Sequence, residues 1–124
     1  MTRFERFAAI DWSGAKGKRH KGIAVAMCGA GEAAPRLVRP GRVWSRTEVL
    51  EWLLEEATAA PTLFGFDFSF APPFAERGEY LPGETGVPKT AREFSPYVDE
   101  RSNDPDLGAA SFLEQAHRRD FFFW

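Results

Sequence analysis

The chain contains little cysteine and histidine and has no long apolar run. Each of these absences argues against a particular class of protein. Its one cysteine, Cys28, cannot form an internal disulfide, and we expect a reducing, cytoplasmic environment. No apolar run approaches the ~20 residues of a membrane-spanning helix, and the first residues lack the apolar segment of a signal peptide, so we expect no membrane partner. The two histidines, His20 and His117, have no sequence neighbour that would make them catalytic bases, and we expect both at the surface.

The chain is well supplied with aromatic residues, and its charge is unevenly distributed. Aromatic residues make up 15% of the 124 residues, which is enough for a real core in a single domain over residues 1–124. Ten of the 16 lysines and arginines, but only three of the 18 acids, lie in residues 1–46. A basic first third can mark a surface that binds nucleic acid, or it can simply balance the acidic remainder.

The spacing of apolar residues and turn formers predicts an α/β chain. Strands are expected at 6–12, 22–29, 36–44 and 62–68, a long helix at 45–60, and shorter helices from Ser95 and at 107–119. The first three strands should be antiparallel, with Pro40 keeping the third at an edge. Ser45 and Glu48 form a capping box at the start of the long helix. Because that helix crosses over, the fourth strand should return parallel to the first, and its apolar character predicts burial on both faces.

The first and fourth strands end in matching motifs. FAAIDWSG at 7–14 and LFGFDFS at 63–69 each place an aspartate, an aromatic residue and a serine after an apolar run. If these strands are parallel neighbours, ~4.8 Å apart, Asp11 and Asp67 meet at one edge of the sheet. Two ionised carboxylates at that spacing repel each other and favour a cation between them. The carboxyl ends of strands are also where open α/β sheets bind ligands.

This order of elements, with an acid ending the first and fourth strands, resembles the ribonuclease H-like fold. The segments AAIDWSG and GFDFSFAPP are similar to a family of uncharacterised bacterial proteins described as predicted nucleases of that fold. The resemblance covers residues 6–74 well and the following helices loosely. It implies a mixed sheet of strand order 3-2-1-4 with helices packed on it.

The resemblance further implies a nuclease that hydrolyses phosphodiester bonds with two Mg²⁺ or Mn²⁺ ions, one activating a water and the other stabilising the leaving oxygen. Asp11 and Asp67 would be catalytic residues and metal ligands. Glu48 is the candidate third ligand, although its capping role accounts for it without a metal. The acid that the fold usually adds from a C-terminal helix is missing, so we expect a domain incomplete at its C-terminus, or another copy of the chain covering the apolar end at 121–124.

Several polar residues near the two aspartates are candidates for contact with phosphate or nucleic acid. They are Ser13, Lys16, Lys18, Arg19, Lys21 and Ser69. Lysine and arginine supply non-specific affinity for nucleic acid, but a solvated basic turn explains the four loop cations equally well. Trp12 and Phe68, which follow the aspartates, can stack on a base, while packing under the sheet is the simpler role.

Two other functions fit the same pattern. Sugar kinases and actin-like ATPases share this core, and their first strand ends in an Asp-x-Gly-x-Thr phosphate turn. In this chain the glycine, Gly14, comes one residue later than in that motif, and Trp12 occupies a position where the turn leaves little room for a side chain. Both differences disfavour ATP binding. The other alternative is a non-catalytic binding or assembly module that kept the fold, and the missing C-terminal acid favours it.

Overall fold

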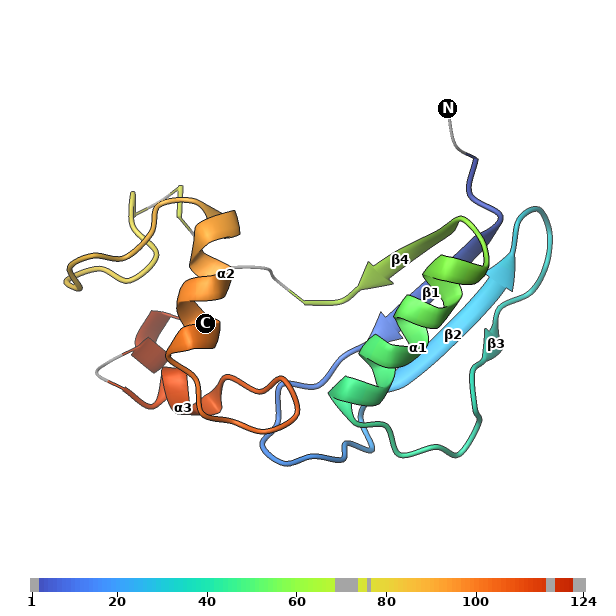
Figure 1. The fold of residues 1–124 in the computed structure, drawn as a ribbon, viewed down its shortest axis with the longest axis horizontal. Helices are drawn as coiled ribbons and strands as arrows, with labels where there is room; N and C mark the ends of the chain where they lie inside the picture. Colours follow the sequence, from blue (N-terminus) through green and yellow to red (C-terminus); the bar gives the residue numbers. More distant parts are fainter. Residues whose placement is uncertain (1–2, 69–73, 76, 116–117, 122–124) are drawn as a thin grey trace. The chain divides into compact units, whose positions relative to one another are not determined.

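The computed structural model describes residues 3–68, 74–75, 77–115 and 118–121. The chain divides into two compact units, residues 1–68 and residues 69–124 (Figure 1). The assignment of residues 1–124 to one domain stays a prediction. No helix in the described ranges is both long enough and apolar enough to cross a membrane.

The first unit is a four-stranded mixed sheet with one helix packed on it (Figure 1). Its strands are β1 (Arg6–Asp11), β2 (Ala24–Gly29), β3 (Arg36–Leu37) and β4 (Thr62–Phe66). They lie in the order β3-β2-β1-β4. Neighbours are antiparallel except β1 and β4, which run parallel. The predicted α/β class, the strand order and the parallel return of the fourth strand are therefore confirmed.

Helix α1 (Arg46–Ala59) connects β3 to β4 and builds the core. Ser45 Oγ accepts a hydrogen bond from the Glu48 amide at 3.1 Å, and the Glu48 carboxylate accepts one from the Ser45 amide at 2.9 Å, which confirms the predicted capping box. From α1, Trp52 packs edge-on against Trp44 and Phe64. The buried core of the unit comprises Ala8, Ile10, Ile23, Val25, Trp44, Val49 and Trp52.

The opposite face of the sheet stays exposed in the structure. Phe7 and Leu63 lie opposite each other on β1 and β4, and they are 39% and 48% exposed. The prediction that the fourth strand is buried on both faces is therefore wrong. Along β4, half-buried residues alternate with exposed ones because α1 covers one side only.

The third strand is much shorter than the predicted 36–44. Only Arg36 and Leu37 pair with β2. The chain then turns, with φ of 48° at Arg39 and 77° at Gly41, and the Arg42 amide bonds the Arg39 carbonyl at 3.0 Å. Proline at position 40 cannot donate to a ladder, so the strand ends before it.

The second unit contains the helices α2 (Ala91–Glu100) and α3 (Ala110–Leu113) and the 3₁₀ turn η1 (Arg118–Phe121). Its buried core consists of Tyr80, Leu81, Phe94 and Phe112.

Both helices of the second unit differ from the sequence prediction. Helix α2 begins before the predicted Ser95, because Thr90 caps it by accepting from the Glu93 amide at 3.3 Å. Of the predicted helix over 107–119, the described residues form α3 and the first part of η1. Its start is delayed because Asp106 and Leu107 both adopt a left-handed φ of 56°. Residues 116–117, including the second histidine, lie outside the description, as do the side chains of 121–124 for which a covering copy was predicted.

Candidate functional site

The two aspartates of the matching motifs converge at one edge of the sheet. Asp11 is the last residue of β1, and Asp67 directly follows β4, which runs parallel to it. Their carboxyl groups are hydrogen-bonded to each other, and both residues are exposed. The parallel pairing thus brings together two acids that are 56 positions apart in the chain.

The surroundings of the two carboxyl groups separate their pKa values. The hydrogen bond to Asp67, together with the charge of Asp67, raises the pKa of Asp11 above its ordinary value. The Trp12 amide donates to Asp67 Oδ1 at 2.8 Å and lowers the pKa of Asp67. Asp67 is therefore the more easily ionised carboxyl of the pair, and Asp11 is the less easily ionised one. A cation bound between the two would favour the ionised form of both.

The carboxylate oxygens at this edge of the sheet are suitable ligands for one hard cation. Carboxylate oxygens suit Mg²⁺ and Mn²⁺, and Mg²⁺ is commonly held by one or two carboxylates with water and substrate phosphate completing its shell. Within the described parts of the chain, no group of three or more His, Cys, Asp or Glu side chains gathers. The pair alone could therefore hold at most one ion, and a second ion would need ligands from elsewhere.

Glu48, the predicted third ligand, does not join the pair. Besides its cap to Ser45, its carboxylate accepts from Arg19 Nη1 at 2.6 Å and forms an ion pair with Arg42. The Ser45 amide, helped by the two arginines, lowers the pKa of Glu48 to about 2. These contacts give Glu48 a structural role at the start of α1.

The lowered pKa of Glu48 predicts a stability that depends on pH. Its contribution is present above the ordinary value of 4.5 and is lost as the pH falls toward 2. We expect Glu48→Gln to lower the free energy of unfolding by ~1 kcal/mol at pH 7, and by progressively less below pH 4.5. Urea unfolding followed by tryptophan fluorescence measures this difference. Glu55→Gln, on the exposed side of α1, is the control, and an unchanged difference at pH 3 would contradict the assignment.

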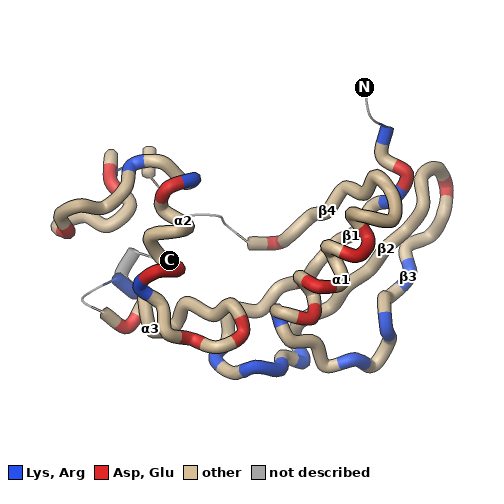
Figure 2. The backbone as a smooth tube through the Cα atoms, viewed as in Figure 1, with Lys and Arg blue, Asp and Glu red and all other residues tan. Residues whose placement is uncertain are grey.

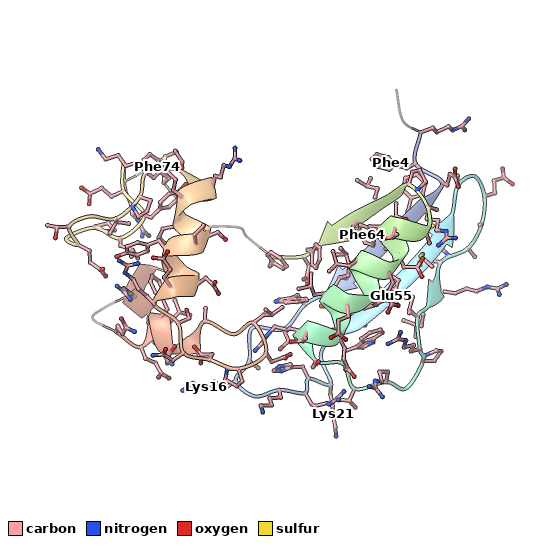
Figure 3. The ribbon with its side chains drawn as sticks, in the orientation of Figure 1. Phe4, Lys16, Lys21, Glu55, Phe64 and Phe74 are labelled. Atoms are coloured by element: carbon pink, nitrogen blue, oxygen red, sulfur yellow. The ribbon has the colours of Figure 1, made fainter. Side chains whose placement is uncertain are left out.

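The loop between β1 and β2 carries most of the predicted phosphate contacts (Figure 2). Lys16, Lys18 and Lys21 are exposed along it, and Figure 3 labels the first and the last of them. Arg19 is already engaged, because it donates to Glu48 and to the Val43 carbonyl at 3.0 Å. The loop therefore carries three exposed lysines.

The remaining predictions near the two aspartates concern two serines and a histidine. Ser13 Oγ accepts from the Ala15 amide at 3.3 Å, which is a local turn. Ser69 lies outside the described residues. The prediction of an exposed His20 is wrong: it is 5% exposed, because its amide bonds the Trp44 carbonyl at 2.9 Å and draws it against the core.

Arg46 is the residue of this site that sequence reasoning missed. It is 3% exposed, and its guanidinium donates to the carbonyls of Ser13, Ala15 and Gly17 at 2.7, 3.1 and 3.5 Å. These bonds hold the glycine-rich loop against the start of α1. No local pattern marks this role, because the three carbonyls lie 29 to 33 residues earlier in the chain.

The fold and the site define an α/β protein with a pair of aspartates at the edge of a mixed sheet where β1 and β4 have their C-terminal ends. Comparison of the chain with models of protein families, with curated proteins and with solved structures finds no match in any of the three. The functional argument therefore depends on the geometry and chemistry of the site.

Proposed function

We propose that the chain is a metal-dependent nuclease of the ribonuclease H-like class that hydrolyses phosphodiester bonds with Mg²⁺ or Mn²⁺. The observation that carries the proposal is the hydrogen-bonded pair of Asp11 and Asp67 at the ends of neighbouring parallel strands. The strand order and the adjacent lysine loop support it.

Each residue of the site has a defined task in this proposal. Asp11 and Asp67 would hold the cation, which supplies an activated water and stabilises charge on the phosphate oxygens. The Trp12 amide orients Asp67, and a bound cation would favour the ionised form of Asp11 against its raised pKa. The exposed lysines of the β1–β2 loop attract the phosphate backbone.

Removing either carboxylate charge is expected to abolish metal binding and hydrolysis. Asp11→Asn and Asp67→Asn each keep the size of the side chain, and asparagine at 67 can still accept from the Trp12 amide. We expect Mn²⁺ affinity and cleavage of DNA or RNA oligonucleotides to fall by at least ~100-fold, since changes that only support a metal ligand cost 10–100-fold. Isothermal titration and gel-based cleavage assays measure the two effects.

The control makes the same chemical change away from the site. Asp99→Asn, at an exposed position of α2, should leave both measurements unaltered. Because the paired carboxylates repel each other, Asp11→Asn should melt in EDTA at the same temperature as the natural chain or higher, which separates loss of function from loss of fold. Unchanged Mn²⁺ affinity in Asp11→Asn would refute the metal site.

A non-catalytic binding module is the second candidate. It is favoured by the finding that only two carboxylates meet in the described structure, while Glu48 is occupied by arginines. Mn²⁺ binding that requires both aspartates, without hydrolysis of any nucleic acid, would select this candidate over the nuclease.

A further inference from the structure

We infer that the first unit binds a small apolar carboxylate, a molecule with a hydrocarbon body and one anionic head, in a groove where the chain turns from β2 into β3 (Figure 1). This hairpin groove is lined by Arg6 and by residues 27–29, 33–34 and 36–38. The inference is independent of the proposed nuclease function and concerns a second site.

The hairpin groove lies at the end of the sheet opposite the two aspartates. Arg6 begins β1 and pairs with Gly29, the last residue of β2, whereas Asp11 ends β1. The five steps from Arg6 to Asp11 span roughly 16 Å along an extended strand. The groove is therefore separate from the aspartate pair, and the two sites can be tested independently.

The volume and the lining of the hairpin groove suit a small apolar molecule. Its volume is about 490 Å³, within the ~300–1,000 Å³ typical of small-molecule sites. Met27 and Val38 line it and also pack against the buried core of the first unit, so this part of the lining is held in place. Leu37 is 60% exposed, the largest fraction among the exposed large apolar residues of the described structure. Covering this apolar surface favours a ligand with a hydrocarbon body.

Arg36 gives the hairpin groove a positive charge. None of the described residues that line the groove is acidic. Arg6 already forms an ion pair with Glu56 of α1, whereas Arg36 is exposed and its side chain makes no hydrogen bond or ion pair with a described residue. A guanidinium matches the two oxygens of a carboxylate and binds them through paired hydrogen bonds. The groove is therefore complementary to an apolar body that carries one carboxylate.

Isothermal titration of the full chain with decanoate, below the concentration at which it forms micelles, tests the inference. We expect decanoate to bind at least ~10-fold more tightly than decanol, which has the same hydrocarbon chain without the charge, because a hydrogen bond to a charged group contributes that factor or more. Arg36→Gln should remove this difference by weakening decanoate binding alone. The matched control is Arg92→Gln, because Arg92 of α2 is likewise exposed and makes no hydrogen bond or ion pair with a described residue.

The apolar part of the site is tested at Leu37. Leu37→Asn should weaken the binding of decanoate and of decanol alike, by about tenfold, because both lose the same apolar contact. Leu54→Asn makes this change at a leucine of α1 that is similarly exposed (56%) and does not line the groove, so it should leave both affinities unaltered. Both substitutions are at exposed positions, and their circular dichroism should match that of the natural chain.

Cys28 reports where the ligand binds. It is the only cysteine of the chain and lines the hairpin groove, so its rate of alkylation by iodoacetamide measures access to this site. We expect saturating decanoate to slow the alkylation severalfold in the natural chain and in Arg92→Gln. At the same decanoate concentration, Arg36→Gln should be protected much less.

The outcomes distinguish this inference from the proposed function. Absence of decanoate binding, equal affinity for decanoate and decanol, unchanged decanoate affinity in Arg36→Gln, or alkylation of Cys28 that decanoate does not slow overturns the inference. Decanoate affinity should be the same in Asp11→Asn as in the natural chain, and Mn²⁺ affinity should be the same in Arg36→Gln. Failure at one site therefore leaves the result at the other intact.

Discussion

Replacing Arg46 with methionine is expected to lower the free energy of unfolding of the first unit by ~2–4 kcal/mol. Hydrogen bonds from a charged donor contribute about 1.5–3 kcal/mol each, and Arg46 makes three to loop carbonyls. The net loss of stability is smaller than the sum of these contributions for two reasons. Methionine does not carry the desolvation cost of a buried guanidinium, and the carbonyls of a surface loop can bind water once Arg46 is gone. Three of the four tryptophans lie in this unit, so urea unfolding followed by fluorescence reports on it.

The same substitution is expected to weaken cation binding at the proposed metal site. The Ser13 carbonyl that Arg46 holds is one residue from the Trp12 amide that binds Asp67. Loss of such a supporting contact typically costs 10–100-fold in metal affinity, so Mn²⁺ titration of the folded variant should show at least ~10-fold weaker binding. Arg46→Lys should restore little of it, because an ammonium group cannot fork between several carbonyls.

A matched variant separates this role from a general effect of charge. Arg42→Met makes the same change at an exposed arginine that forms an ion pair with Glu48, and it should cost less than ~1 kcal/mol and leave Mn²⁺ affinity unchanged. Similar losses in Arg42→Met and Arg46→Met would contradict the specific role of Arg46.

Replacing Glu84 with glutamine is expected to destabilise the second unit by ~2–3 kcal/mol. Arg118 is 6% exposed and binds both oxygens of Glu84, Nε to Oε1 at 2.8 Å and Nη2 to Oε2 at 2.9 Å. Breaking a fully buried pair costs about 3–5 kcal/mol, and the side chain of Glu84 is 23% exposed, which lowers the expected cost. Urea unfolding followed by circular dichroism, and amide exchange in α2, measure it.

The control and the double variant identify the cause of this loss. Glu100→Gln removes the exposed partner of Arg101 and should change stability by less than ~0.5 kcal/mol. The double variant Glu84→Leu with Arg118→Leu should be more stable than Glu84→Gln, because no unpaired guanidinium remains buried. If the double variant loses as much stability as Glu84→Leu and Arg118→Leu lose together when made singly, the pair does not act as a unit.

The pH dependence of this pair follows from the charge on Glu84. The hydrogen bonds and the charge of Arg118 lower the pKa of Glu84 from its ordinary 4.5. Its stabilisation is therefore present above pH 4.5 and is lost as the pH falls below that value.

Local signals in the sequence were reliable where neighbouring residues decide the structure. The start of α1 follows from Ser45 and Glu48, which cap one another three residues apart. The parallel return of β4 follows from one crossover helix between two apolar runs. The strand order, which the resemblance to the ribonuclease H-like fold implied, then brings Asp11 and Asp67 together.

Sequence reasoning failed where distant packing decides the structure. The exposed side of β4 and the buried His20 depend on which face α1 covers and on the pairing with Trp44. Helix α2 starts earlier than predicted because the Thr90 cap outweighs the local preference of Ser95 and the proline after it.

By itself, the amino-acid sequence determined the α/β class, the parallel return of the fourth strand and the position of an acid at the end of two strands. These features depend on periodicity and connection length, which are properties of short segments. Only the tertiary structure decided that Glu48 serves the helix cap and two arginines, and that Arg46 holds the loop beside the aspartates. Both outcomes arise from contacts between residues far apart in the chain, because an ionised side chain binds whichever donors or carbonyls the fold brings nearest.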